Sequence, residues 1–327
     1  MDLLAFIGFV CVIYTLIYFI YPWLADCDIQ LAFLEKFGKP ISSLKGQVVW
    51  ITGASSGIGE HLAYVLAKGG CKLVLTARRE AELQKVKRVC LEENADLKDD
   101  DILILPLDIC NTDLHQETFK TIITKFGKLD ILVNNAGRSQ RAKWENIELS
   151  VDREMFELNV FSQLSLSRMV MKYFLQNNYG HIVVTSSLAG ILPVPGSATY
   201  SGTKHALHGY FNSFLLEKGD KNIFITLICP GAVQTNFLAE AFTETSGKKF
   251  GVNTDVSTTK ISVKRCATLM AVAIANKVSE AWISQPIGLL ITYLVKYYPN
   301  VGSWFVIKLL GTQFLKHLRD AKNADKL

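Results

Sequence analysis

The sequence carries little excess charge of either sign. Its 327 residues include 35 lysines and arginines against 30 aspartates and glutamates, and the formal net charge of +5 is spread along the chain. A basic patch of the kind that binds nucleic acid is therefore not expected. With 49% hydrophobic and 20% charged residues, the chain can bury a large core, which excludes wholesale disorder.

Metal-binding patterns are also missing. The seven cysteines are widely spaced, and the sequence contains no CxxC pair and no cluster of cysteine with histidine. Structural zinc sites need such clusters. We therefore expect no metal ion, and we expect reduced structural cysteines rather than disulfides.

Charged residues are absent from Leu3–Leu24. A helix over this run, at ~1.5 Å per residue, would be roughly 33 Å long, enough to cross the hydrocarbon core of a membrane. The sequence thus predicts a membrane anchor (or uncleaved signal) over residues 1–25 and a linker over 26–45. A cleaved signal peptide is the alternative, but no Lys or Arg precedes the run. The lysines that follow favour a catalytic body on the cytosolic side.

Short apolar runs alternate with helical patterns after this segment. The runs lack the in/out alternation of a half-exposed strand, so they indicate buried parallel strands. They are Val48–Ile51, Lys72–Thr76, Ile102–Leu107, Ile131–Val133, Ile182–Thr185 and Ile223–Ile228. The helical patterns are Glu60–Lys68, Glu80–Glu93, Leu114–Phe126, Arg153–Gln176 and Lys204–Glu217. This order predicts an α/β fold, a Rossmann-like doubly wound parallel sheet, in a single catalytic domain over 46–285.

The composition changes near Pro286. Residues 286–327 form an apolar to amphipathic C-terminal extension, rich in Leu, Ile and aromatic residues with lysines interspersed. Two interpretations stay open. The extension packs on the sheet or on a dimer partner, or it makes a second, peripheral membrane contact.

A glycine-rich turn follows the first predicted strand and opens the first helix. Gly53 permits a tight turn, Gly57 lets the backbone approach a pyrophosphate, and Gly59 lets helix and strand pack closely. The free N–H groups of the helix start then face phosphate. The predicted cofactor-binding residues of this turn are Gly53, Ser55, Ser56, Gly57, Ile58 and Gly59.

Two arginines, Arg78 and Arg79, follow the second strand. An NAD-binding protein commonly has an acidic residue here, which accepts hydrogen bonds from the ribose hydroxyls. A guanidinium group instead suits a 2′-phosphate, because its planar fork donates two hydrogen bonds at once. The position therefore favours NADP(H) over NAD(H).

Tyr200 and Lys204 lie four residues apart on a predicted helix and share one face. Reduction of a carbonyl needs a proton donor, and the phenol pKa of about 10 is too high for rapid exchange unless a nearby cation lowers it. Tyr64 and Lys68 have the same spacing. Only Tyr200 has a serine, Ser187, thirteen residues before it at a strand end, so we expect Tyr64 and Lys68 to form an ordinary surface pair.

These motifs resemble the short-chain dehydrogenase/reductase family. The residues that carry the resemblance are Thr52–Gly59, Asp108, Asn134–Gly137, Asn159, Ser187, Tyr200, Lys204 and Pro230–Thr235, in order and at family spacings over roughly residues 46 to 280. The N-terminal run, the Val-Val-Trp strand and the tail after Trp282 resemble its membrane-bound member 7 subgroup.

The resemblance implies a catalytic role for each matching residue. Tyr200 would be the general acid in reduction, and Lys204 would lower its pKa and hold the nicotinamide ribose. Ser187 would hydrogen-bond the substrate oxygen, with Ser186 as the candidate if the register slips by one. Asn159 would hold a water molecule that continues a proton relay from Lys204.

The resemblance also implies cofactor contacts beyond the glycine-rich turn. Asp108 would meet the adenine, or would cap the helix that follows. Asn135, Ala136 and Gly137 would line the adenosine side. The nicotinamide side would be formed by Pro230, Gly231, Val233 and Thr235.

The substrate is expected to be lipophilic. The loop at 236–255 contains four apolar side chains (Phe237, Leu238, Phe242 and Phe250), and the stretch from Leu188 to Val194 would form a second, mostly apolar wall. An apolar pocket beside a membrane, with the endoplasmic reticulum as the expected compartment, suits a steroid, a retinoid or a lipid-derived ketone or aldehyde. Membrane lipid and a possible homodimer partner complete the expected interactions.

Three functions are compatible with these residues. The favoured one is an NADPH-dependent carbonyl reductase. The second is an NAD-dependent alcohol or hydroxysteroid dehydrogenase that works in the oxidative direction. The third is a tethered scaffold that binds nucleotide without turnover, which the intact Ser187, Tyr200 and Lys204 disfavour.

Overall fold

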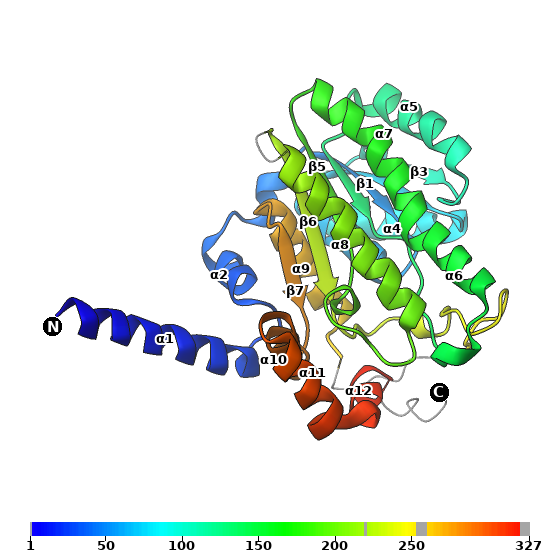
Figure 1. The fold of residues 1–327 in the computed structure, drawn as a ribbon. Helices are drawn as coiled ribbons and strands as arrows, with labels where there is room; N and C mark the ends of the chain where they lie inside the picture. The colour runs from blue at the N-terminus through cyan, green and yellow to red at the C-terminus, as the bar shows by residue number, and fades with distance from the viewer. Residues whose placement is uncertain (1, 219–220, 253–259, 321–327) are drawn as a thin grey trace.

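The protein folds around one seven-stranded parallel sheet (Figure 1). The computed structural model describes residues 2–218, 221–252 and 260–320. The strand order is β3-β2-β1-β4-β5-β6-β7, so the order reverses between β1 and β4. The strands are β1 Val48–Thr52, β2 Lys72–Ala77, β3 Ile102–Pro106, β4 Ile131–Asn134, β5 Gly180–Thr185, β6 Ile223–Pro230 and β7 Glu280–Ile283.

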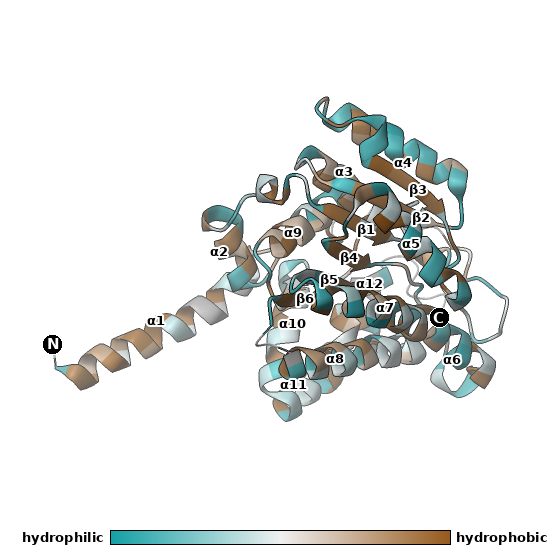
Figure 2. Ribbon diagram, turned by 90° about the horizontal axis from the view of Figure 1, so that it is seen from above, coloured by the Kyte–Doolittle hydropathy of each residue, from teal (hydrophilic) through white to brown (hydrophobic). Residues whose placement is uncertain are grey.

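Helices cover both faces of the sheet, which confirms the predicted doubly wound class. Alternate residues of each strand enter opposite cores: Val49 and Ile51 of β1 pack on one face, and Val48 and Trp50 on the other. Because both faces are buried, the strands are apolar throughout, as the hydropathy coloring in Figure 2 shows. One face carries α3 Gly57–Lys68, α4 Glu80–Glu93 and α9 Val263–Ala275, and the other α5 His115–Phe126, α7 Ser162–Gln176 and α8 Ala198–Lys218.

All six predicted strands are present, but the sequence analysis predicted neither β7 nor α9. The strand β7 has four residues, too few for a clear pattern. The helix α9 packs between α3 and α2 (Ile29–Phe37). Nine of its 13 residues are buried, so it lacks the amphipathic stripe by which a surface helix is recognised.

The long helix predicted over Arg153–Gln176 is interrupted. It consists of α6 (Leu149–Phe156), a π-helical turn η5 (Glu157–Phe161) and α7. The extra residue of a π turn rotates the side chains that follow, and such turns are frequent at functional sites. Here the turn carries the buried Asn159.

The N-terminal helix α1 (Leu3–Leu24) extends away from the body (Figure 1). Apolar side chains along it are exposed, among them Leu4, Phe6 and Phe9. Within the described ranges, no helix combines the length and the apolarity that crossing a membrane requires.

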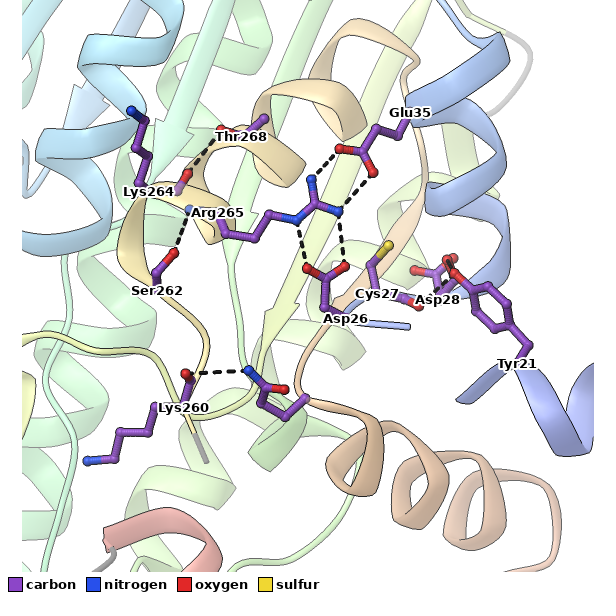
Figure 3. Close-up of polar contacts among 11 residues, drawn as sticks. Tyr21, Asp26, Cys27, Asp28, Glu35, Lys260, Ser262, Lys264, Arg265 and Thr268 are labelled. Carbon is purple, nitrogen blue, oxygen red and sulfur yellow. Dashed lines mark hydrogen bonds and ion pairs between the residues drawn. The ribbon is translucent and has the colours of Figure 1, made fainter. Parts of the chain in front are cut away.

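Residues 26–45, interpreted from the sequence as a linker, are packed on the body. They contain α2 and the short helix η1 (Ile41–Leu44), and Leu31 and Leu44 are buried in the core. The guanidinium of Arg265 on α9 binds the carboxylates of both Asp26 and Glu35 (Figure 3). The segment is therefore part of the folded domain.

A buried aspartate joins this segment to the edge of the sheet. One carboxylate oxygen of Asp28 accepts from the backbone N–H of Leu31 at 2.9 Å and starts α2. The other accepts from the backbone N–H of Trp282 in β7 at 2.7 Å. Cys27 adds an antiparallel bridge to Ile283. The edge strand β7 is thus covered rather than left open.

The C-terminal extension folds back over the end of the sheet. It forms α10 (Pro286–Tyr297), α11 (Pro299–Phe305), a π-helical turn η8 (Val306–Leu310) and α12 (Gly311–Asp320). Figure 1 shows these helices together at the end where the strands terminate.

The packing of α2 can be tested with a matched pair of substitutions. Leu31→Ala removes a fully buried side chain, so the free energy of unfolding should fall by about 2–5 kcal/mol. Phe33→Ala, on the exposed side of the same helix, should change it by less than about 0.5 kcal/mol. Denaturant titration of the solubilised protein measures both. Equal effects would contradict the inclusion of this segment in the core.

Candidate active site

The glycine-rich turn has the geometry that a dinucleotide phosphate requires. Gly53 and Gly57 have positive φ angles of 66° and 61°, which other residues rarely adopt. A Cβ atom on Gly59 would lie 2.4 Å from the carbonyl oxygen of Gly53, so no side chain fits there. The turn ends at the start of α3, where the positive end of the helix dipole favours an anion, and the first N–H group, that of Gly57, donates to the Glu60 carboxylate at 3.1 Å. These residues fit the pyrophosphate of a nicotinamide dinucleotide.

The two arginines after β2 face different groups. Nη2 of Arg79 donates to the hydroxyl groups of Ser55 at 3.3 Å and Ser56 at 3.1 Å, so its guanidinium lies against the glycine-rich turn. Nη1 of Arg78 lies 3.8 Å from a carboxylate oxygen of Asp108. Asp108 also accepts from the backbone N–H of Cys110 and so closes the turn after β3. Of the two, Arg79 contacts the turn directly, and Arg78 faces Asp108.

The residues after β4 brace three strand ends. The side-chain amide of Asn135 donates to the carbonyl groups of Thr52 and Gly53, and its oxygen accepts from Thr185 at the end of β5. The hydroxyl of Thr52 accepts from the backbone N–H groups of Asn135 and Ala136. Asn135 therefore connects the ends of β1, β4 and β5 by hydrogen bonds. The sequence analysis included Thr52 in the glycine-rich motif and Thr185 in a predicted strand but gave neither hydroxyl group a role, because hydroxyl groups at strand ends are common.

Lys204 is fully buried below Tyr200 on α8. Its ammonium nitrogen donates to the carbonyl oxygen of Thr185 at 2.7 Å and lies 5.6 Å from the centre of the Tyr200 ring. Burial disfavours the charged form and lowers the Lys204 pKa to about 8. The ring of Phe237 meets Tyr200 edge-on, with centroids 6.3 Å apart. The predicted pair thus shares one face, and burial brings the titration of Lys204 closer to neutral pH.

The structure distinguishes the two adjacent serines. Ser187 lines the cavity that contains Tyr200, and its hydroxyl donates to the carbonyl of Pro230 at 3.2 Å. The hydroxyl of Ser186 is buried and lies 3.0 Å from Nε2 of His208, away from that cavity. Ser187 is therefore the serine placed to meet a substrate.

Asn159 holds the strand-end loop beside the lysine. Its oxygen accepts from the backbone N–H of Arg138, and its amide donates to the Arg138 carbonyl and to Thr203. A Cβ atom on Gly137 would lie 3.0 Å from the Asn159 oxygen and 3.9 Å from the Lys204 nitrogen. Gly137 therefore leaves room between these two groups. The water relay through Asn159 stays a prediction.

The second tyrosine–lysine pair has a different environment. The hydroxyl of Tyr64 donates to Glu60 at 2.8 Å instead of facing Lys68. Burial, reinforced by this carboxylate, raises the Tyr64 pKa. The expected surface pair of Tyr64 with Lys68 is replaced by a bond to Glu60, and the raised pKa is the reverse of what an acid–base catalyst needs.

A mostly apolar cavity opens at the carboxyl ends of the strands. Its walls include the predicted stretch at Leu188–Val194 and, from the predicted loop, Phe237 and Leu238. Phe242 packs instead in a separate cluster below the guanidinium of Arg138. Residues 253–255 of the loop lie outside the described residues.

The predicted segment after β6 also reaches this cavity. Gly231, Val233 and Thr235 line it. A Cβ atom on Gly231 would lie 2.4 Å from the Ser284 hydroxyl, which explains the glycine. The hydroxyl of Thr235 accepts from the backbone N–H of Phe237 and starts the short helix η7 (Asn236–Leu238).

The far side of the cavity comes from residues that the sequence analysis did not select. Arg141 lies in the loop after β4, and Ile291, Leu315 and Asp320 come from the C-terminal extension. No local motif marks them, since only the folding-back of the extension brings them to the site.

Comparison with known proteins agrees with this geometry. The sequence pattern of the short chain dehydrogenase family matches residues 47–246. Dehydrogenase/reductase SDR family member 7 of Homo sapiens is 42% identical over 92% of this chain and 88% of its own length. 11-beta-hydroxysteroid dehydrogenase-like 2 of Arabidopsis thaliana is 32% identical over 94% and 97%.

Solved structures show the same fold. A short chain dehydrogenase/reductase from Burkholderia phymatum in complex with NAD superimposes with a TM-score of 0.68, at 24% identity over 79% of this chain and 95% of the other. The predicted likeness to the member 7 subgroup is confirmed by the human relative. The chain belongs to the short-chain dehydrogenase/reductase family and is an NAD(P)-dependent oxidoreductase.

Proposed function

We propose that the protein reduces a lipophilic ketone or aldehyde with NADPH, with Tyr200 as the general acid. The observation that carries this proposal is the meeting of Ser187 and Tyr200 in one apolar cavity, with the buried Lys204 below the phenol. A polar substrate would leave its other groups unsatisfied against such walls.

The residues divide the chemistry between them. A bound nicotinamide supplies the hydride to the carbonyl carbon. Ser187 donates a hydrogen bond to the carbonyl oxygen, and Tyr200 transfers its proton to that oxygen as negative charge develops there. The Lys204 ammonium stabilises the phenolate that remains. Solvent then returns the proton by way of Lys204 and Asn159, whose polar ends both lie beside Gly137.

The substrate class is inferred from the walls of the cavity. Leu188, Leu192, Val194 and Phe237 offer apolar contact, which suits a steroid, a retinoid or a lipid ketone. A relative with 32% identity is named as 11-beta-hydroxysteroid dehydrogenase-like, which supports a steroid-sized ligand.

Substitution of the general acid tests the mechanism. Tyr200→Phe should lower kcat for ketone reduction by at least about 100-fold, because the proton donor is lost, and should leave NADPH affinity within about twofold. Tyr64→Phe is the matched control, since it removes the same hydroxyl from a tyrosine with the same lysine spacing, and should keep normal kcat. Steady-state kinetics and cofactor fluorescence provide the two readouts. A fully active Tyr200→Phe enzyme would refute the assignment.

The cofactor preference is assigned to Arg79. Loss of its charge-assisted hydrogen bonds to a 2′-phosphate should raise the Kd of NADPH about 10- to 100-fold in Arg79→Ala and leave the Kd of NADH nearly unchanged. Arg88→Ala, on the exposed side of α4, is the control. Equal losses for both cofactors would favour the NAD-dependent alcohol dehydrogenase alternative.

We further infer that the protein is attached to a membrane, with the endoplasmic reticulum and a cytosolic catalytic body as the expected arrangement. The exposed apolar side chains of α1 support attachment, as do Val301, Trp304, Ile307 and Leu309 in the C-terminal extension. By contrast, Leu289 and Ile291 of α10 are buried, so the extension both packs on the body and offers an exposed apolar face.

Vesicle flotation tests this attachment. The full chain should float with phospholipid vesicles, and a chain without residues 2–24 should lose most of that binding. Extraction at alkaline pH separates a spanning segment, which resists it, from a peripheral one. Failure of the full chain to float would contradict attachment.

A homodimer is proposed through α7 and α8. Phe161, Leu175 and Tyr210 on and beside these helices are exposed, which favours burial against a second copy. Light scattering of the solubilised enzyme would give a mass of one protomer if this proposal is wrong.

A further inference from the structure

A buried ion pair fastens the end of the C-terminal extension to the active-site loop. Nη2 of Arg141 lies 2.6 Å from Oδ1 of Asp320, and Nε donates to both carboxylate oxygens at 3.1 and 3.0 Å. The two side chains are only 7% and 2% exposed. They are 179 positions apart in the sequence, so the contact is purely tertiary.

The arginine is rigidly held on its own side. Nη1 donates to the Ser139 hydroxyl at 2.8 Å and to the Gln140 carbonyl at 2.6 Å. The side chain of Gln140 exchanges hydrogen bonds with the backbone N–H and the hydroxyl of Thr199, which directly precedes Tyr200. The pair is therefore attached to the start of the helix that carries the proposed general acid.

The same pair closes the cavity. Arg141 and Asp320 line it together with Ser187 and Tyr200, and Leu315 reaches it from the preceding turn of α12. The helix begins at Gly311, where φ is +73° and the chain changes direction. The helix α12, which follows a glycine turn and carries the buried ion pair at its far end, thus forms part of the substrate wall.

The energetics make docking of α12 depend on both charges. Removing an ion from water costs several kcal/mol, and a close bidentate pair offsets that cost only while both partners are present. Without the carboxylate, the guanidinium would stay buried and uncompensated. When α12 leaves the cavity, the guanidinium of Arg141 returns to water. We therefore expect the helix to undock once the carboxylate is removed.

We propose that the Arg141–Asp320 pair is a latch that holds α12 as a wall of the substrate pocket and thereby sets the preference for extended apolar substrates. Both are positioning residues, since they act on the pocket by holding α12 and its Leu315 in place. The inference rests on the proposed function for the identity of the pocket, but not for the docking of the helix.

A series of ketones that differ only in length tests the selectivity. For 2-butanone, 2-octanone and 2-dodecanone, each methylene in contact with the wall contributes up to about fourfold to kcat/KM. In Asp320→Asn, kcat/KM should fall at least tenfold for 2-dodecanone and remain unchanged for 2-butanone. The Kd of NADPH should stay within twofold of the wild-type value. Asp320→Glu should restore at least half of the kcat/KM that is lost for 2-dodecanone, because it restores the negative charge.

A control variant distinguishes the effect of losing this ion pair from the effect of losing an ion pair elsewhere in the protein. Asp100→Asn removes the partner of Lys125, which lies at the same 2.6 Å distance but has an exposed carboxylate, and should leave the length profile unchanged. An identical profile in wild type and Asp320→Asn, with cofactor binding intact, would overturn the proposal.

Limited proteolysis tests docking without turnover. Trypsin should cut the full-length NADPH-bound protein after Lys316 on α12 at least ten times faster in Asp320→Asn than in wild type or in Asp100→Asn. Equal cleavage rates would overturn the latch. If none of the ketones is reduced by wild type but cleavage accelerates as expected, the proposed substrate class fails and the latch stands.

Discussion

The site depends on keeping the ammonium group of Lys204 out of water. A fully buried cation is costly, and here the ammonium group donates to the carbonyl oxygen of Thr185 at the end of β5. Burial lowers the pKa of Lys204 to about 8, which leaves the group charged at neutral pH but able to exchange a proton. The phenol of Tyr200 above it gains the electrostatic support that Tyr64 lacks.

The surroundings follow from this constraint. Glycine at 137 leaves the space between Lys204 and Asn159, and the π-helical turn η5 carries Asn159 in a buried position. Hydrogen bonds of Thr52 and Asn135 connect the ends of β1, β4 and β5, which fixes the position of the Thr185 carbonyl that accepts from Lys204. A rigid sheet edge thus supports a group whose charge is poorly solvated.

The segment after α1 and the C-terminal extension are both packed against the catalytic domain. The segment after α1 covers the edge strand through Asp28 and is fastened to α9 by Arg265. The strand β7 leads directly into α10, whose residues enter the cavity wall, and α12 closes that wall through Asp320. The N-terminal segment therefore braces the edge strand and α9, and the C-terminal extension forms part of the substrate wall.

The sequence by itself determined the doubly wound sheet, the glycine-rich turn and the identity of Ser187, Tyr200 and Lys204. These features depend on local chemistry: apolar runs, residues without a Cβ atom, and a four-residue helical spacing. The tertiary structure decided that Arg79 bonds to the turn while Arg78 faces Asp108, that residues 26–45 are packed, and that Asp320 meets Arg141. Those contacts join segments that are distant in the chain, and no local pattern specifies which distant surfaces will meet.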